Sequence, residues 1–575
     1  MAATRGGEGA GPGREAVRAE LAECAATAAA DPDLRSLAEV LRQAGDRLEQ
    51  PMRVAVAGQI KRGKSTLINA LIGRRIAVTG ALELTLIVNE FCYGKNPVVT
   101  IHRRNTSATE QVCVERFAEF TTRDPDDPGR HADIRKVVYE LPHELLLDFR
   151  LVDTPGLGSV HGVDSADTAA YLGISAMTDT AERSEVTRLL AASGRTARDL
   201  HQESADEVDR ADAVVYAFSR GLHERDRLAV EEFAGPVAGT MSPLKAVGVL
   251  TKCDQQYWPP GPGLTGAADP MDYDPMATAT TIADRYQAQT QVNRLFYAIV
   301  PVAGLVASGA RSLSPEKFDW LADLARTADP RRLVHHLEDA GEFANAERLR
   351  GVSLSAAQRR VLIEELGAWG IHLGCRYLRA ELGEAAVRDQ LVAGSGVERL
   401  RGLIQGHFGH RAALIKLDKG VQQAWAEIAR VRLARQQGGG PAEAGPALDI
   451  VADRLQRLRQ RGHGFAELAT LTAHYRGRLD FTDEQIDQLL QVTGEHGTTC
   501  AARVGLPEDA PAGAIRARAD DLVKVWAALA ADRTLAAREQ QAVRTVLGCY
   551  QRIQARARRA ELLLNTTDEL ALDDE

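Results

Sequence analysis

The chain has 575 residues and a formal net charge of −9, and 45% of its residues are hydrophobic and 26% charged. These values predict two or three globular domains and argue against a disordered chain and against a nucleic-acid binder held by overall positive charge. The seven cysteines include no CxxC pair, and no apolar run of about 18 residues occurs, so the sequence suggests no zinc site, no disulfide framework and no transmembrane helix.

Residues 1–13 are rich in glycine and predict a disordered N-terminus. Two helices are expected to follow, over 14–30 and 32–49, and Asp31 is placed to cap the second of them. Apolar residues recur in this second helix every three or four positions, as in a heptad seam. A seam requires a partner helix, so we expect residues 14–50 to pair with a bundle formed by the C-terminal part of the chain.

From Met52 onward strands alternate with helices, a pattern typical of an α/β domain with a mostly parallel sheet. The loop GQIKRGKS, Gly58–Ser65, lies between the first strand and a helix, which is the context of a phosphate loop. Lys64 is expected to reach the β- and γ-phosphates, and the Ser65 hydroxyl to bind Mg²⁺. The other residues of this stretch expected to contact the nucleotide are Gly58, Arg62, Gly63 and Thr66. A glycine-rich turn that binds nothing is the alternative.

Two later segments have the character of nucleotide-sensing switches. Thr85 precedes the predicted strand 87–93 and is a candidate second Mg²⁺ ligand that senses the γ-phosphate. The apolar strand 149–153 ends in the motif DTPG, which would place the Asp153 carboxylate near Mg²⁺, through water, and the Gly156 N–H near the γ-phosphate. A surface threonine and an ordinary strand turn are the alternatives.

A further strand ends in the motif TKCD, which favours guanine. An aspartate at the end of this motif accepts two hydrogen bonds from guanine N1 and N2, while the lysine stem covers the base. Adenine lacks both donors in that arrangement, so a buried carboxylate would be left unpaired. The residues assigned to the base site are Thr251, Lys252 and Asp254, together with Val302 and Ala303 in the loop expected to close over the base.

The predicted GTPase domain spans residues 51–407 and contains a helical insertion at 308–394. Residues 408–575 are predicted to form a helical stalk. Seven arginines flank a Gly/Pro-rich linker near 430–461, which is a possible membrane tip: each would contribute about 1 kcal/mol near an anionic lipid surface. The alternative is a solvated helix face with carboxylate partners. The arginines are Arg430, Arg432, Arg435, Arg454, Arg457, Arg459 and Arg461.

A GTPase domain with helices before it and a long helical region after it resembles the bacterial dynamin-like proteins, in particular the actinobacterial isoniazid-inducible (Ini) type. The resemblance rests on GQIKRGKST, VTGALELTLIVNEFCYG, DTPG, TKCD and the stretch 464–468, and covers most of residues 34–555. It implies an enzyme that hydrolyses GTP with Mg²⁺, assembles through its GTPase faces or with a dynamin-like paralogue, and remodels an anionic membrane surface. It also implies a cytoplasmic protein associated peripherally with the inner face of the cell membrane.

The phosphate loop departs from the dynamin pattern at two positions. Dynamins usually carry Gln and Ser where this chain has Ile60 and Lys61. Ile60 cannot orient water, and Leu157 after DTPG provides no Ras-like glutamine either. We hypothesise that Lys61, with Arg62, stabilises transition-state charge in place of a monovalent cation. Two solvated surface cations are the alternative.

Two other functions fit the same motifs. One is a switch-type GTPase whose helical region binds a protein, a ribosome or RNA rather than lipid. The other is a GTP-binding scaffold with negligible turnover. Liposome co-sedimentation distinguishes the switch-type GTPase from a membrane-remodelling enzyme. GTP turnover measured against protein concentration distinguishes the scaffold from an enzyme that assembles.

Overall fold

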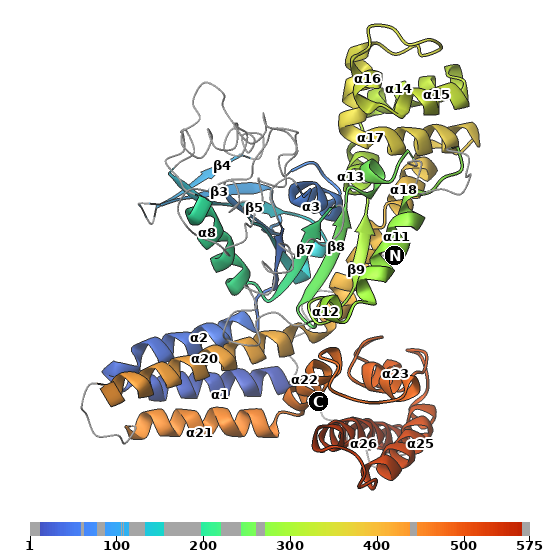
Figure 1. The fold of residues 1–575 in the computed structure, drawn as a ribbon. Helices are drawn as coiled ribbons and strands as arrows, with labels where there is room; N and C mark the ends of the chain where they lie inside the picture. Colours follow the sequence, from blue (N-terminus) through green and yellow to red (C-terminus); the bar gives the residue numbers. More distant parts are fainter. Residues whose placement is uncertain are drawn as a thin grey trace, which may run out of the picture. The chain divides into compact units, whose positions relative to one another are not determined.

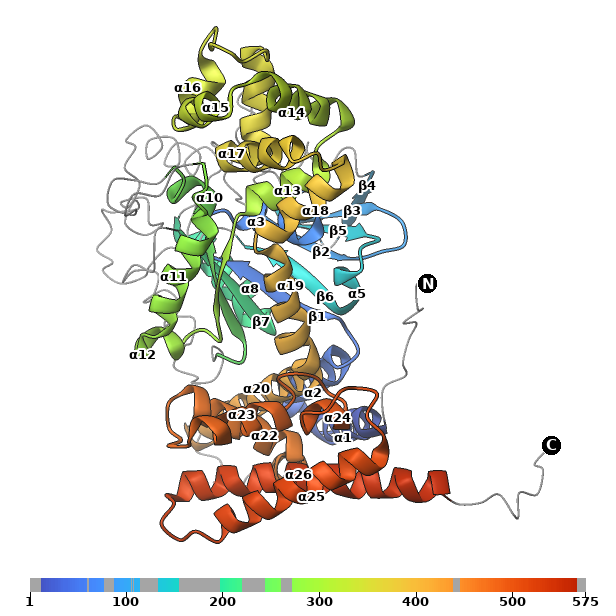
Figure 2. The ribbon, with the colours of Figure 1, turned by 90° about the vertical axis from the view of Figure 1, so that its right-hand side faces the viewer.

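The computed structural model describes residues 12–58, 62–76, 87–104, 106, 108–113, 133–154, 197–219, 243–259, 271–437 and 445–565. The chain divides into two compact units (Figures 1 and 2). One, named here the sheet unit, is Pro51–Leu403. The other, named the helical unit, combines Met1–Gln50 with Ile404–Glu575.

The sheet unit is built on nine strands, which pair among the described residues in the order β4-β3-β5-β2-β6-β1-β7-β8-β9 (Figure 1). Five neighbouring pairs are parallel and three are antiparallel. The predicted α/β fold with a mostly parallel sheet is therefore confirmed. The strands are β1 (Met52–Ala57), β2 (Val88–Tyr93), β3 (Val98–Arg103), β4 (Thr109–Val112), β5 (Ile134–Leu141), β6 (Phe149–Asp153), β7 (Ala213–Phe218), β8 (Ala246–Thr251) and β9 (Ile299–Val302).

Strand β1 lies between β6 and β7 and runs parallel to both. Every residue of β7 and β8 is buried, as expected for parallel strands covered on both faces. Because the carboxyl ends of parallel strands meet at one edge of a sheet, the residues that follow β1, β6 and β8 come together there. The first helices of this unit are α3 (Lys64–Ile72), α5 (Leu145–Asp148), α8 (Ala197–Arg210), α10 (Cys253–Gln256), α11 (Pro275–Gln287), α12 (Thr290–Asn293) and α13 (Gly304–Ser312).

The region predicted as a helical insertion consists of short capped helices and one long kinked one. Each of α14 to α17 begins with a side chain that accepts a hydrogen bond from a backbone N–H of the first turn. In α17, Gly367 has φ 69° and ψ 170°, which interrupts the helix. The helices are α14 (Pro315–Thr327), α15 (Pro330–Leu337), α16 (Ala340–Asn345), α17 (Ala356–Arg379), α18 (Glu384–Gly394) and α19 (Val397–Leu403), and the capping residues are Ser314, Asp329, Asp339 and Ser355.

In the helical unit the two N-terminal helices pack against α20 and α21, and all four share one hydrophobic core. Asp31 caps a single 3₁₀ turn, after which α2 begins. A Cβ on Gly420 would lie 2.5 Å from the Ala44 Cβ, so the close approach of α20 to α2 requires glycine there. The helices are α1 (Pro12–Ala29), α2 (Arg35–Arg47), α20 (Ala412–Gln437), α21 (Pro446–Arg461), α22 (His463–Tyr475), α23 (Asp483–Val492), α24 (Cys500–Arg503), α25 (Ala512–Ala530) and α26 (Ala537–Asn565).

The last helix of the chain has a different partner from the first two. Its apolar seam is buried, for example at Val543, Tyr550 and Ile553. This seam faces α25, which runs beside α26, and also α22 and α23 (Figure 2). The sequence predicted that residues 14–50 pair with a bundle formed by the C-terminal part of the chain. In the structure they pack on α20 and α21, two helices of that part.

Most of the arginines predicted to gather at a membrane tip form ion pairs. Four of the seven pair with carboxylates of the helical unit, which is the arrangement of the solvated-face alternative. The pairs are Arg430 with Glu427, Arg432 with Asp449, Arg435 with Asp31 and Arg454 with Glu23. Among the described residues, no helix combines the length and the apolar character needed to cross a membrane.

Candidate nucleotide site

The two ends of the predicted phosphate loop are held by glycines in conformations that other residues rarely adopt. Gly58, directly after β1, has φ 140°, and a Cβ on it would lie 2.2 Å from the Ala217 carbonyl oxygen. Gly63 has φ 82° and precedes the first residue of α3. The backbone therefore turns sharply into the N-terminus of α3, an arrangement suited to an anion. The middle of the loop, residues 59–61, lies outside the described residues.

Lys64, Ser65 and Asp153 meet where β6 ends and α3 begins. The Ser65 hydroxyl donates a hydrogen bond of 2.8 Å to Asp153 Oδ2. Burial raises the pKa of Asp153 to about 6, although the Lys64 ammonium and the Ser65 hydrogen bond act in the opposite direction. Burial likewise lowers the pKa of Lys64 to about 8, opposed by Asp153 and assisted by Arg62. Both charges are thus held in a dry environment, where a phosphate or a cation would interact with them strongly.

This group of residues fits a magnesium ion. Asp153 is fully buried, and its Oδ1 has no hydrogen-bond partner in the described part of the chain. An unpaired buried carboxylate oxygen is costly, and a hard cation with oxygen ligands would remove the cost. Ser65 offers a second oxygen beside it. Among the described residues, Ser65 and Asp153 would therefore hold Mg²⁺. The third ligand expected from the sequence, Thr85, lies outside the described residues.

Thr251 and Arg62 connect the phosphate loop to the ends of β7 and β8. The Thr251 hydroxyl lies 2.6 Å from the Arg62 carbonyl oxygen and 2.9 Å from the Phe218 carbonyl oxygen. The Arg62 guanidinium donates to Ser219 Oγ at 2.8 Å. These contacts give both residues a role in positioning the loop, in addition to the nucleotide contacts expected from the sequence.

Asp254 lies at a cavity between the phosphate loop and the ends of β8 and β9. Only 3% of this residue is exposed, and neither carboxylate oxygen has a hydrogen-bond partner among the residues described. Burial raises its pKa to about 6. Three nearby donors lower this pKa in part: the backbone N–H groups of Asp254 and Gln255 and the Lys252 ammonium. None of them forms a hydrogen bond with the carboxylate. The cavity is lined by Gly63, Thr66, Leu67, Thr251, Lys252, Asp254, Gln255, Gly304 and Leu305.

The residues after β9 that line this cavity lie slightly further along the chain than Val302 and Ala303, which the sequence had suggested. Val302 and Ala303 are fully buried, and the Ala303 N–H donates to the Ser395 carbonyl oxygen at 2.9 Å. The residues that line the cavity are the next two, Gly304 and Leu305. Val302 and Ala303 therefore support the cavity wall from behind.

Sequence reasoning missed the contribution of α17. At its kink, a Cβ on Gly367 would lie 3.4 Å from Asp254 Oδ2, so the backbone of α17 lies directly beside this carboxylate. Two residues earlier, Glu365 forms ion pairs with Lys317 and, at 3.2 Å, with Arg75, which follows α3. The available signal was a glycine inside a helical pattern, which often has a packing or functional reason.

Several predicted site residues lie outside the described residues: Ile60, Lys61, Thr85, Gly156 and Leu157. Their roles stay predictions. Those that the structure does bring together are Gly58, Arg62, Gly63, Lys64, Ser65, Thr66, Asp153, Thr251, Lys252 and Asp254.

Comparisons with known proteins point to one family. The profile of the dynamin family matches residues 54–206. The isoniazid-induced protein IniC of Mycobacterium tuberculosis is 30% identical over 483 residues, which cover 83% of this chain and 85% of that protein. A bacterial dynamin-like protein of Nostoc punctiforme is 32% identical over 114 residues, 18% of this chain and 16% of that protein. A solved structure of an oligomerised bacterial dynamin pair aligns with 99% of this chain and 78% of its own, at 10% identity and a TM-score of 0.30. The resemblance drawn from the motifs is confirmed.

Proposed function

The chain belongs to the dynamin family, and from that premise we propose that it binds GTP with Mg²⁺, hydrolyses it and couples nucleotide-dependent self-association to the remodelling of a membrane. The dynamin-type GTPase domain accounts for guanine-nucleotide binding in general. The nucleotide and Mg²⁺ assignments are supported by the residues discussed below, whereas assembly and the membrane rest on family membership.

In this proposal Asp254 is the residue that selects guanine over adenine. Its two carboxylate oxygens are buried and unpartnered beside the cavity, where each costs about 1–3 kcal/mol if nothing pairs with it. Guanine N1–H and N2–H₂ supply two donors to such a carboxylate, whereas adenine supplies neither in that arrangement. Lys252, which also lines the cavity, has the aliphatic stem needed to cover the base.

Each phosphate-loop residue has a role in hydrolysis under this proposal. Lys64 binds the β- and γ-phosphates from the start of α3, and Ser65 and Asp153 hold Mg²⁺. When bound, Mg²⁺ neutralises charge that develops on the phosphate oxygens. Thr85 would add a ligand that depends on the γ-phosphate, and the Gly156 N–H would bind the γ-phosphate itself. Lys61 would supply a positive charge in cis, in place of a monovalent cation. Ile60 cannot position water through its side chain, so backbone or switch residues would do this.

Nucleotide preference and turnover are the direct test. Fluorescent GDP bound to the purified chain should be displaced by GTP at least about 100-fold more readily than by ATP, and phosphate should be released only when Mg²⁺ is present. Equal displacement by ATP would overturn the guanine assignment. GTP binding without phosphate release at any protein concentration would favour the scaffold function.

The membrane part of the proposal rests on family membership alone, and one observation favours a second candidate. Because Arg430, Arg432, Arg435 and Arg454 already pair with carboxylates, a lipid surface would have to compete for them. A switch-type GTPase whose helical unit binds another macromolecule is therefore the second candidate. A dynamin-like paralogue is the partner expected if the chain assembles with a protein other than itself.

Vesicle sedimentation distinguishes the two candidates. The full chain is incubated with neutral vesicles or with vesicles containing anionic lipid, with GDP, with a non-hydrolysable GTP analogue or without nucleotide. A membrane-remodelling protein that works peripherally at the inner face of the cell membrane should sediment with anionic vesicles, most strongly with the analogue, and less at high salt. Absence of sedimentation in every condition would contradict membrane remodelling and leave the switch function.

A further inference from the structure

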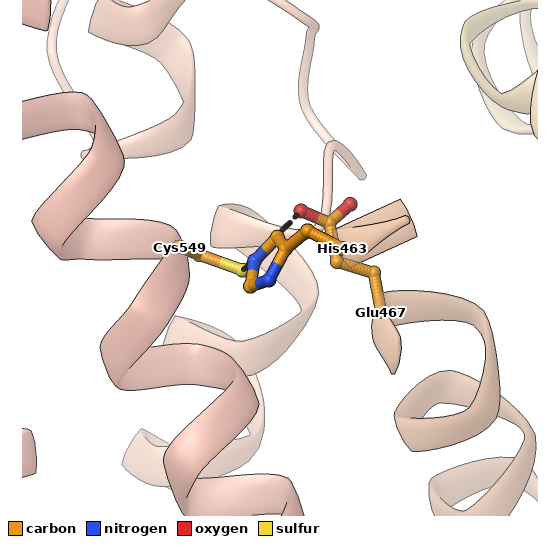
Figure 3. Close-up of side chains that lie close together, drawn as sticks. All are labelled: His463, Glu467 and Cys549. Carbon is orange, nitrogen blue, oxygen red and sulfur yellow. Dashed lines mark hydrogen bonds and ion pairs between the residues drawn. The ribbon is translucent and has the colours of Figure 1, made fainter. Parts of the chain in front are cut away.

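A histidine, a glutamate and a cysteine meet in the helical unit, whereas the candidate nucleotide site belongs to the sheet unit. His463 and Glu467 are four residues apart on α22 and so share one helix face. Cys549 comes from α26, 86 residues further along. Their ligand atoms all lie within 4.8 Å of one another (Figure 3). None of these residues takes part in the proposed nucleotide chemistry.

The three donor atoms have the spacing of zinc ligands. His463 Nε2 lies 3.0 Å from Cys549 Sγ and 3.5 Å from Glu467 Oε1, and Cys549 Sγ lies 3.3 Å from the same Oε1. Zinc binds nitrogen, oxygen and sulfur at about 2.0–2.3 Å in a tetrahedron, which places neighbouring ligand atoms about 3.3–3.8 Å apart. The observed triangle needs an expansion of only a few tenths of an ångström to fit this tetrahedron.

The surroundings resemble the outer shell of a metal site. The Arg503 guanidinium donates to the same Glu467 Oε1 at 2.7 Å and so fixes the orientation of the carboxylate; a carboxylate oxygen can accept this bond and still bind a metal ion. Gly548 makes room for the imidazole, since a Cβ there would lie 3.1 Å from His463 Cε1. Of the three residues, His463 also lines a cavity, which it shares with α26 residues that include Gly548 and Arg552.

We propose that His463, Glu467 and Cys549 bind one Zn²⁺ ion, with water in the fourth position. The thiol proton passes to solvent as the Zn–S bond forms, and the imidazole binds in its neutral form. The thiolate and the carboxylate then balance the two charges of the cation. The ion joins α22 to α26 and thereby stabilises the packing between these two helices.

The alternative is a hydrogen-bonded cluster without metal. In that cluster the thiol donates to the carboxylate, and the imidazole N–H donates to the sulfur or to the same carboxylate. Both arrangements are compatible with the distances, so metal binding itself has to be measured.

The test uses the full chain, reduced and freed of metal with a chelator, and two cysteine variants. Zn²⁺ is titrated against a chromophoric chelator, and Co²⁺ serves as a spectroscopic probe because thiolate ligation gives a charge-transfer band. Cys549→Ser removes the sulfur ligand. Cys24→Ser is the matched control, since Cys24 is also a buried free thiol on a helix of this unit. Circular dichroism checks that each variant is folded, and Glu467→Gln, which conserves size, is a second variant.

Wild type and Cys24→Ser should each bind one Zn²⁺ per chain and show the charge-transfer band. In Cys549→Ser the band should be absent, and in this variant and Glu467→Gln the affinity should fall at least about 10-fold. Zn²⁺ at 100 times the wild-type dissociation constant should raise the unfolding temperature of wild type by about 5 °C and that of Cys549→Ser by about half as much or less. A wild-type chain without saturable binding, or a band that persists in Cys549→Ser, would overturn the proposal.

Discussion

Ser65 Oγ donates a hydrogen bond of 2.8 Å to Asp153 Oδ2 and so connects the first turn of α3 with the end of β6. The other oxygen of the carboxylate is buried and has no partner among the described residues. One oxygen of the Asp153 carboxylate is thus hydrogen-bonded, and the other is available to a cation. This arrangement makes Ser65 the most informative position at which to test magnesium binding.

Ser65→Ala should weaken nucleotide binding in the presence of Mg²⁺ by about 10-fold or more and leave binding in chelator nearly unchanged, because only the metal ligand is lost. Titration of fluorescent GDP with and without Mg²⁺ measures both values. Ser312→Ala, which removes a half-buried helix hydroxyl bonded to the Ser308 carbonyl, should change neither. An equal loss of affinity in both conditions would show that Ser65 does not act through Mg²⁺.

Asp254→Asn should lower the affinity for GTP by about 100-fold or more, because the amide donates where guanine also donates. The same amide matches xanthine, which carries a carbonyl oxygen at position 2, so xanthosine triphosphate should bind the variant better than wild type. Competition against a fluorescent nucleotide measures this switch. Asp389→Asn, an exposed position on α18, is the control. If Asp254→Asn keeps its preference for GTP, the carboxylate does not read the base.

The stability of the nucleotide-free chain should depend on pH through Asp254. Its pKa is raised by burial from 3.8 to about 6 in the folded state. Protonated Asp254 therefore contributes to the free energy of unfolding. This contribution is fully present below pH 3.8 and is lost as pH rises through 6. Asp254→Asn cannot ionise, so above pH 7 it should be more stable than wild type by up to about 3 kcal/mol.

Urea unfolding of both proteins between pH 5 and pH 8 measures this difference in the free energy of unfolding. The gap should narrow as pH falls toward 5. A gap that does not change with pH would mean that the Asp254 carboxylate is not desolvated.

Glu90→Gln should destabilise the sheet unit by about 3–5 kcal/mol. Glu90 is fully buried on β2 and forms ion pairs with Arg53 at 3.2 Å, with Arg150 at 2.9 Å and with Lys136. Burial alone would raise the pKa of Glu90, but the three cations outweigh it and the pKa is lowered. Neutralising the carboxylate leaves buried positive charge uncompensated.

The control for Glu90 is Glu110→Gln, which breaks an exposed pair with Arg103 and should cost less than about 1 kcal/mol. Because the folded pKa of Glu90 is lowered, its contribution is present at neutral pH and lost under acid conditions. The two variants should therefore unfold at clearly different urea concentrations at pH 7. Equal unfolding curves would contradict the assigned role of the network.

Lys61→Ser tests whether the loop supplies its own positive charge. If Lys61 stabilises transition-state charge, the variant should hydrolyse GTP at least about 10-fold more slowly than wild type in Na⁺ buffer. Added K⁺ should restore part of the rate, because serine recreates the dynamin pattern. Turnover with and without K⁺ measures this. A variant as fast as wild type without K⁺ would refute the idea.

The local features of the candidate nucleotide site could be predicted from the sequence. Gly58 and Gly63 lie at the two ends of one loop, and Lys64 and Ser65 begin the helix after it. Asp153 ends β6, and Asp254 follows the end of β8 by three residues. Their arrangement was predictable because the carboxyl ends of parallel strands meet at one edge. The buried face of the second helix could also be predicted, because apolar residues that recur every three or four positions indicate a buried helix face.

Which helix surfaces meet within each unit could be learned only from the folded structure. Periodicity identifies a buried face but not its partner, so it could not show that α2 packs on α20, or that α26 packs on α25. For the same reason the kink at Gly367 beside Asp254 could not be foreseen. The absence of CxxC spacing argued against a zinc site, yet His463 and Cys549 come within 3.0 Å because α22 and α26 pack side by side. Contacts between residues distant in sequence depend on the packing of whole helices, and a local pattern does not contain that information.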